Sequence, residues 1–220
     1  MIIEIDNVEL YFKNKRILNG IYLKAERGKI TGILGSNGCG KSCLLNIIFG
    51  NLKPKYKLIR IDNKPILKPL YQTGLVAYLT QQHFIPNRIK VKTVFKLFNV
   101  SWEEFANTFQ SFNLYKNLIF NKLSSGERRL LETYMILKSN HKIVLLDEPF
   151  SHLSPLYIDQ IKTLISKEKQ KKTIIITDHM YRHIVDMSDT VYLLKNGNTK
   201  LINDFKELED YKYLSIGSLD

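Results

Sequence analysis

The sequence predicts an α/β protein with a mostly parallel sheet, an N-terminal antiparallel β portion and a small helical insert. Three observations lead to this fold class. Strand-length apolar runs alternate with helical patterns along most of the chain, which is typical of a covered parallel sheet. Residues 2–23 instead hold short strands joined by polar turns, which indicates antiparallel pairing. Between about 84 and 122 the apolar spacing becomes helical, which places the insert.

The individual strands follow from period-two alternation or from short, continuous apolar runs. They are expected at residues 2–5, 8–12, 17–23, 29–34, 57–61, 75–79, 143–146 and 173–177. Asn196 and Gly197 predict the turn of a hairpin near the C-terminus, because both residue types accept the positive φ that a tight hairpin turn requires.

Helices are expected where apolar residues recur every three or four positions. These segments cover residues 43–49, 93–98, 102–109, 125–137, 155–167 and 181–185. We interpret residues 1–220 as a single domain, in which about 84–137 form a helical subdomain.

Composition narrows the class of protein. No apolar run approaches the about 18 residues that a membrane span needs, and Glu4 and Asp6 argue against a signal peptide, so a cytoplasmic protein is expected. The net charge is +12, but the lysines are scattered, and the densest cluster at 167–172 is expected to be a solvated loop. We therefore expect no direct contact with nucleic acid.

A phosphate-binding loop is the most specific motif in the chain. It comprises Gly35, Ser36, Asn37, Gly38, Cys39, Gly40, Lys41 and Ser42, and matches G-x-x-x-x-G-K-[ST] between a predicted strand and a predicted helix. Glycines let successive backbone N–H groups face an anion, and the helix N-terminus points at the same place. Lys41 can reach the β- and γ-phosphates, and the hydroxyl of Ser42 can ligate Mg²⁺.

Cys39 and Cys43 are the only cysteines, too few for a metal site. A small residue tolerated in the loop is the preferred interpretation of Cys39, and a redox switch is the alternative, because a helix N-terminus can lower a thiol pKa.

Two carboxylates end the buried strand at 143–146. Asp147 can hold Mg²⁺ beside Ser42, and Glu148 can orient and polarise the water that attacks the γ-phosphate. The alternative is an acidic turn that closes a strand, which becomes less convincing with a phosphate loop upstream.

Leu123-Ser124-Ser125-Gly126-Glu127 resembles the LSGGQ signature of ABC-type ATPases, the ATP-binding subunits of ABC transporters. In that family this segment caps the γ-phosphate held by the phosphate loop of a second subunit, so the cofactor-binding set gains Ser124, Ser125, Gly126 and Glu127. A plain helix cap formed by a serine and Glu127 is the alternative.

The resemblance extends from Tyr11 to His179 and implies a P-loop NTPase core that uses ATP and Mg²⁺. Tyr11 matches the aromatic residue that stacks on adenine. Gln81 matches the glutamine that contacts Mg²⁺ and the attacking water, although Gln82 is adjacent. His179 matches the histidine that contacts the γ-phosphate. Catalysis is thus expected from Glu148, His179 and Gln81, and metal binding from Ser42, Gln81 and Asp147.

The family resemblance also implies partners. A second ATPase subunit, forming a head-to-tail homodimer, and an integral membrane permease are expected, with peripheral association at the cytoplasmic face. A soluble ABC-type ATPase acting on nucleic acid, ribosomes or protein complexes is the main alternative. A P-loop kinase leaves the signature and His179 unexplained. Two residues depart from the family pattern: Ser125 replaces a glycine of the signature, and Ser154 replaces a carboxylate thought to couple the two sites.

Overall fold

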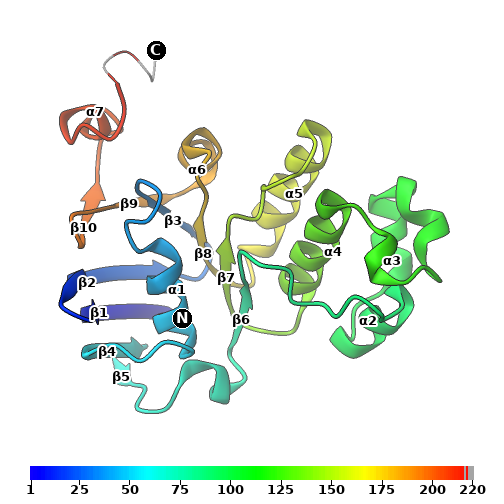
Figure 1. The fold of residues 1–220 in the computed structure, drawn as a ribbon, viewed down its shortest axis with the longest axis horizontal. Coiled ribbons are helices and arrows are strands. Elements are labelled where there is room, and N and C mark those ends of the chain that lie inside the picture. The colour runs from blue at the N-terminus through cyan, green and yellow to red at the C-terminus, as the bar shows by residue number, and fades with distance from the viewer. Residues whose placement is uncertain (216, 218–220) are drawn as a thin grey trace.

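The computed structural model describes residues 1–215 and 217, and it contains two β-sheets (Figure 1). The larger sheet has the order β10 (Asn198–Ile202), β9 (Thr190–Lys195), β3 (Ile30–Leu34), β8 (Thr173–Thr177), β7 (Ile143–Asp147) and β6 (Val76–Leu79). All of its pairings are parallel except that of β10 with β9. The smaller, antiparallel sheet has the order β2 (Lys15–Glu26), β1 (Ile2–Phe12), β4 (Tyr56–Ile61) and β5 (Lys64–Pro65). The predicted combination of sheets is present.

The N-terminal strand differs from the prediction of two separate strands. β1 runs without interruption through residues 6 and 7, but its register against β2 shifts between Ile5 and Val8 and again further along. Asn7 takes a positive φ of 49°, a conformation that asparagine tolerates better than most residues. An irregularity of this kind changes which side chains face the core, which matters for the aromatic residues that end β1.

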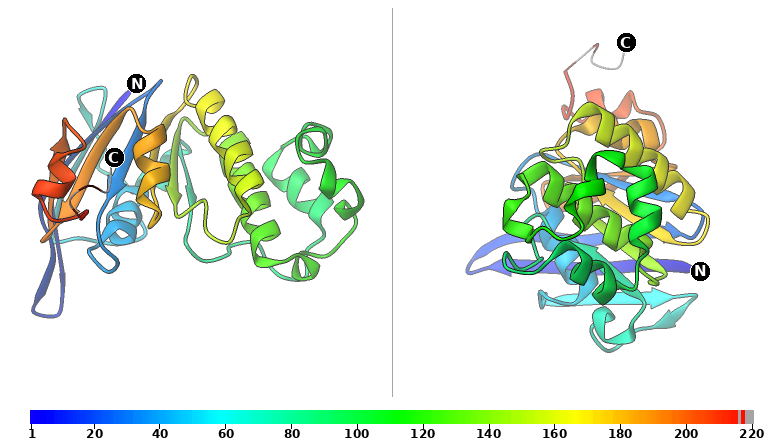
Figure 2. Two further views of the ribbon diagram at one scale, coloured as in Figure 1. Left: turned by 90° about the horizontal axis from the view of Figure 1, so that it is seen from above. Right: turned by 90° about the vertical axis from the view of Figure 1, so that its right-hand side faces the viewer.

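Helices pack on both faces of the larger sheet and form one end of the molecule (Figure 1). They are α1 (Lys41–Phe49), α2 (Val91–Phe98), α3 (Trp102–Thr108), α4 (Ser125–Lys138), α5 (Pro155–Glu168), α6 (Tyr181–Met187) and α7 (Glu207–Asp210). Short 3₁₀ turns occupy Leu70–Thr73, Gln110–Tyr115 and Phe120–Lys122. α2 and α3 lie at the end of the molecule opposite β1 and β2 (Figure 2). No helix within the described residues is long and apolar enough to cross a membrane.

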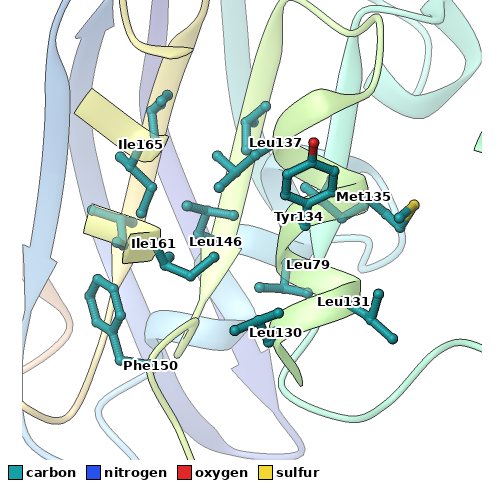
Figure 3. Close-up of a cluster of buried hydrophobic side chains, with 14 of the residues drawn as sticks. Leu79, Leu130, Leu131, Tyr134, Met135, Leu137, Leu146, Phe150, Ile161 and Ile165 are labelled. Carbon is teal, nitrogen blue, oxygen red and sulfur yellow. The ribbon is translucent and has the colours of Figure 1, made fainter. Parts of the chain in front are cut away.

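A hydrophobic core lies on each face of the larger sheet. Along β7, Ile143 and Leu145 pack toward α1 and the antiparallel sheet, whereas Val144 and Leu146 pack toward α4 and α5. This alternation is what a strand buried on both faces requires. Figure 3 shows the second core, where Leu130 of α4 and Ile161 of α5 lie on the same side as Leu146. The nucleotide-binding motifs therefore stand on strands that are fixed from both sides.

An aromatic cluster forms the core of the helical insert. Phe95 packs edge-on against Trp102 at a centroid distance of 5.0 Å, and Phe105 lies 4.9 Å from Tyr134 of α4. Phe95, Trp102 and Phe105 are all buried. These rings hold the insert together and attach it to α4.

The basic cluster at 167–172 is only partly the solvated loop that was predicted. Lys172 is buried, and its ammonium donates to the carbonyl of Ser139 just beyond α4 and lies 4.0 Å from Glu168. Lys169 pairs with Asp189 at 3.0 Å. Two of these lysines therefore join elements of the fold, and their charge is not available to an outside partner.

Candidate functional site

The predicted motifs follow strands whose carboxyl ends meet at one edge of the sheet. Leu79 pairs with Leu146, Asp147 pairs with Thr177, and Thr177 pairs with Ile33. Gln81, Glu148, His179 and the start of the phosphate loop follow one or two residues beyond these positions. In an open α/β sheet, ligands bind in the crevice beyond this edge, so the register alone brings these four motifs together.

A cleft of about 630 Å³ opens at this edge. It is lined by Phe12, Ile17, Asn37, Gly38, Gly40, Lys41, Ser42, Cys43, Gln81, Glu148 and His179. All three predicted catalytic residues thus face the same space as the central part of the phosphate loop. Gln82 does not line this cleft, which favours Gln81 over Gln82.

The phosphate loop depends on glycine where it approaches β2. Gly40 has a φ of 111°, and a Cβ at this position would lie 2.9 Å from Cδ2 of Leu18. The loop holds Lys41 in place, because its Nζ donates to the carbonyl oxygens of Gly35 at 2.6 Å and Ser36 at 3.2 Å. The ammonium is therefore positioned at the loop before any phosphate arrives.

Ser36 and Cys39 lie on the other side of the loop. They line a separate groove of about 430 Å³ with Lys15, Arg16 and Asn196. Burial raises the pKa of the Cys39 thiol. The thiolate is the reactive form of cysteine, so the redox-switch interpretation loses its support.

The aromatic residue at the cleft is Phe12, and Tyr11 does not line it. Successive side chains of a strand point to opposite sides. The hydroxyl of Tyr11 accepts from Nε of Arg16 at 2.8 Å, and the ring lies 5.3 Å from the same guanidinium and 5.4 Å from the ammonium of Lys55. Phe12 is 48% exposed. The structure therefore places Phe12 at the cleft in place of the predicted Tyr11, and Phe12 becomes the candidate for stacking on adenine.

Asp147 has the environment of a metal ligand. It is 1% exposed, and its Oδ2 accepts from the hydroxyl of Tyr78 at 3.1 Å, which in turn accepts from Nδ2 of Asn46. Its other oxygen, Oδ1, is buried without a hydrogen-bond partner among the described residues. A buried carboxylate oxygen left without a donor beside Ser42 fits Mg²⁺, which prefers oxygen ligands and keeps water and phosphate in its remaining positions.

Burial raises the pKa of Asp147, although the nearby hydroxyls of Ser42 and Tyr78 oppose the shift. The folded protein thus holds the proton more tightly than the unfolded chain does. The free energy of unfolding therefore falls as the pH rises above the unfolded pKa of about 4, and it continues to fall until the pH passes the raised folded pKa.

Asp147→Asn is accordingly expected to stabilise the nucleotide-free protein by about 1–2 kcal/mol at neutral pH, because the amide carries no charge into the interior. The gain should shrink below about pH 4, where the wild-type carboxyl is also neutral. Thermal unfolding of both proteins across this pH range is the measurement, and Asp6→Asn, a partly exposed substitution, is the control. A variant that melts below wild type at neutral pH contradicts the assignment.

Glu148 is the centre of the polar contacts in the cleft. Its Oε2 accepts from Nε2 of Gln81 at 3.2 Å and from the hydroxyl of Ser151 at 3.2 Å, and it lies 3.7 Å from Nδ1 of His179. Glu148 has a φ of 52°, uncommon for a residue with a side chain. Strained conformations of this kind cluster at functional sites.

Arg129 is a site residue that the sequence analysis missed. It is 2% exposed, and its guanidinium donates to the carbonyls of Thr80, Asp147 and Glu148, with 2.6 Å to Thr80 and 2.7 Å to Glu148. The residue belongs to α4, the helix that follows the signature segment. One buried cation thus fixes the backbone on either side of the cleft.

The signature segment lies outside the cleft that holds the other motifs. Ser124 caps α4 by accepting from the backbone N–H of Glu127 at 3.2 Å, and Glu127 accepts from the backbone N–H of Ser124 at 2.7 Å. Ser124 and Glu127 therefore form the helix cap that the alternative interpretation predicted. Ser125 lines a second cleft of about 370 Å³. Ser154 is exposed at the N-cap of α5 and makes no side-chain cap.

Comparison with known proteins agrees with this arrangement. The family model for ABC transporters matches residues 18–151, more than half of the chain. The chain belongs to the ABC transporter family. As an ABC ATPase it is an ATP-hydrolysing, nucleotide-binding subunit, and the predicted family, fold class and general function are confirmed.

Individual relatives support the same conclusion. The ABC ATPase is 32% identical to an energy-coupling factor transporter ATP-binding protein of Methanococcus maripaludis, over 82% of this chain and 70% of the relative. It is 27% identical to the lipopolysaccharide export system ATP-binding protein of Haemophilus influenzae, over 89% and 88% of the two chains. A solved structure of an ATP-binding subunit of an ABC transporter shares its fold, with a TM-score of 0.81 at 20% identity over 100% and 97% of the two chains. These relatives do not favour the soluble alternative.

Proposed function

We propose that two copies of this ABC ATPase close head to tail around two molecules of ATP, each bound with Mg²⁺, and that hydrolysis drives a separate membrane permease. One observation carries the proposal. The cleft contains the phosphate loop, Gln81, Glu148 and His179, but none of Ser124, Ser125, Gly126 or Glu127 lines it. This lining supports a signature segment that is supplied to each ATP by another chain.

Each residue of the cleft has a role that its chemistry suits. Phe12 provides an exposed ring for adenine at the end of β1. Lys41 and the backbone N–H groups of the loop hold the phosphates, and His179 approaches the γ-phosphate. Gln81 and Glu148 orient the attacking water, with Glu148 as the base.

Asp147 and Ser42 would hold Mg²⁺, and Gln81, which lines the same cleft as Ser42, would join them when nucleotide is bound. The ion would neutralise charge on the β- and γ-phosphates. The donor set among the described residues includes no cluster of three or more His, Cys, Asp or Glu that would trap a metal by itself. This agrees with an ion that arrives with ATP.

We further propose that the subunit works at the cytoplasmic face of a membrane, as a single nucleotide-binding domain whose residues about 84–137 form a helical subdomain. The two relatives described above are named as ATP-binding proteins of an energy-coupling factor transporter and of a lipopolysaccharide export system. A permease partner for this chain follows by analogy with them.

Ser124→Asp tests the composite site. Aspartate is as good an N-cap as serine, so α4 should remain capped, but its charge would repel the γ-phosphate of the partner's ATP. The isolated chain should bind a fluorescent ATP analogue within about twofold of wild type. ATP-dependent dimerisation, measured by light scattering with Mg²⁺ present, should be lost.

Ser101→Asp is the matched control, because Ser101 caps α3 in the same way, accepting from the backbone N–H of Glu104 at 3.2 Å. This variant should dimerise as wild type does. A Ser124→Asp chain that forms ATP-dependent dimers normally, or that loses nucleotide binding as a monomer, contradicts the head-to-tail arrangement.

A further inference from the structure

His83 connects the segment after Gln81 with the start of α4. Its Nδ1 lies 2.8 Å from Oε2 of Glu132, and its Nε2 lies 3.2 Å from the hydroxyl of Ser125. Glu132 is fully buried, and its Oε1 accepts from the backbone N–H groups of Phe84 at 3.1 Å and Ile85 at 3.3 Å. An ionised carboxylate can only accept, so Nδ1 donates to it, and Nε2 is left to share a hydrogen bond with the hydroxyl of Ser125.

Gln81 is therefore flanked by two attachments to the same helix. On one side the carbonyl of Thr80 accepts from Arg129 at 2.6 Å, and on the other His83 contacts Ser125 and Glu132. Arg129, Ser125 and Glu132 all belong to α4. Any displacement of the start of α4 is thus passed to both ends of the short segment that carries Gln81.

The start of α4 is also held from the other side. A Cβ on Gly126 would lie 2.4 Å from the carbonyl oxygen of His152, so the helix touches the backbone of the turn that follows Glu148. Contact this close excludes a larger residue at Gly126. The hydroxyl of Ser125, by contrast, turns toward His83 in its own chain.

We propose that the hydrogen bond between His83 and Ser125 couples the signature segment to Gln81, so that docking of the partner's ATP on one chain sets the position of Gln81 in the same chain. His83 is in this sense a positioning residue, with Glu132 as its anchor. The inference rests on the proposed function, because only a head-to-tail dimer brings ATP to the signature segment.

A double-mutant cycle on kcat tests the coupling. His83→Ala and Ser125→Ala should each lower kcat about fivefold, and the double variant should be no slower than either single variant, because all three lose the same contact. Nucleotide affinity of the monomer should change by less than about twofold, since the signature does not serve the chain's own ATP. Ser125→Thr keeps the hydroxyl and should restore kcat.

His141 and Ser139 offer a matched control, because Nδ1 of His141 lies 3.0 Å from the hydroxyl of Ser139 at the opposite edge of the sheet. Alanine variants of this pair should leave kcat unchanged. Additive losses in the His83 and Ser125 cycle, or a Ser125→Thr variant as slow as Ser125→Ala, overturn the coupling. Failure of Ser124→Asp to block the dimer would instead overturn the proposed function, so the two failures are distinguishable.

Discussion

Glu148→Gln is expected to lower ATP hydrolysis by at least about a hundredfold and to leave a stable ATP-bound dimer. The amide has the shape of the carboxylate and can still accept from Gln81 and Ser151 through its oxygen. The positive φ of Glu148 costs glutamine no more than it costs glutamate, so the backbone should not move. What the variant loses is the ability to take a proton from water.

Loss of the charge also favours retention of ATP, because a carboxylate near the γ-phosphate repels it. Steady-state phosphate release and light scattering in ATP and Mg²⁺ measure the two effects. Glu103→Gln is the control, since Glu103 is exposed, lies outside the cleft and contacts the side chains of Lys116 and Ser101. A rate of ATP hydrolysis within about threefold of wild type would show that Glu148 is not the general base.

The sequence was sufficient to predict the convergence of the motifs. Each motif directly follows a short apolar run, and parallel strands place their carboxyl ends at one edge. Lys41, Asp147 and Glu148 were assigned to one site from their motifs, whereas His179 was assigned through the resemblance to ABC-type ATPases. The central strands could also be recognised from the sequence, because a strand that is buried on both faces appears as a nearly continuous apolar run.

The adenine platform could not be predicted in the same way. Tyr11 and Phe12 are adjacent aromatic residues, and their order on the two faces of β1 depends on irregularities in its pairing with β2. A shift of one residue exchanges the faces. The local sequence near Asn7 does not indicate where the register shifts. The spacing of the family motif therefore predicted that Tyr11 faces the cleft, whereas Phe12 faces it in the structure.

His83, Glu132 and Arg129 were missed for a different reason. Arg129 and Glu132 contact backbone carbonyls and N–H groups, and His83 contacts Glu132 and the hydroxyl of Ser125. Contacts of this kind have no signature in a sequence. Charged residues on a helix ordinarily lie in solvent, and only tertiary packing reveals that Glu132 and Arg129 are buried. A buried charge needs compensation, and the compensation here comes from the loops that carry Gln81 and Glu148.

Arg129→Met is expected to destabilise the protein by about 3–5 kcal/mol, the usual result when a buried cation that satisfies several groups is removed. Burial lowers the pKa of Arg129, opposed by the charges of Glu132, Asp147 and Asp178. Removing the guanidinium leaves three carbonyls without their donor and these carboxylates without a buried cation. Lysine should recover little, because one ammonium cannot reproduce the planar fork that reaches Thr80, Asp147 and Glu148 together.

Urea unfolding at neutral pH measures this loss, and Arg128→Met is the matched control. Arg128 is the preceding residue, yet its guanidinium only stacks on Phe120 at 5.5 Å and makes a long hydrogen bond of 3.5 Å to the carbonyl of Ile85. It should cost about 1 kcal/mol or less. If Arg129→Met is no more damaging than Arg128→Met, then the carbonyls near Gln81 and Glu148 are satisfied without Arg129. The cleft would then derive its geometry from the strands alone, because no cation would be needed to hold its two sides together.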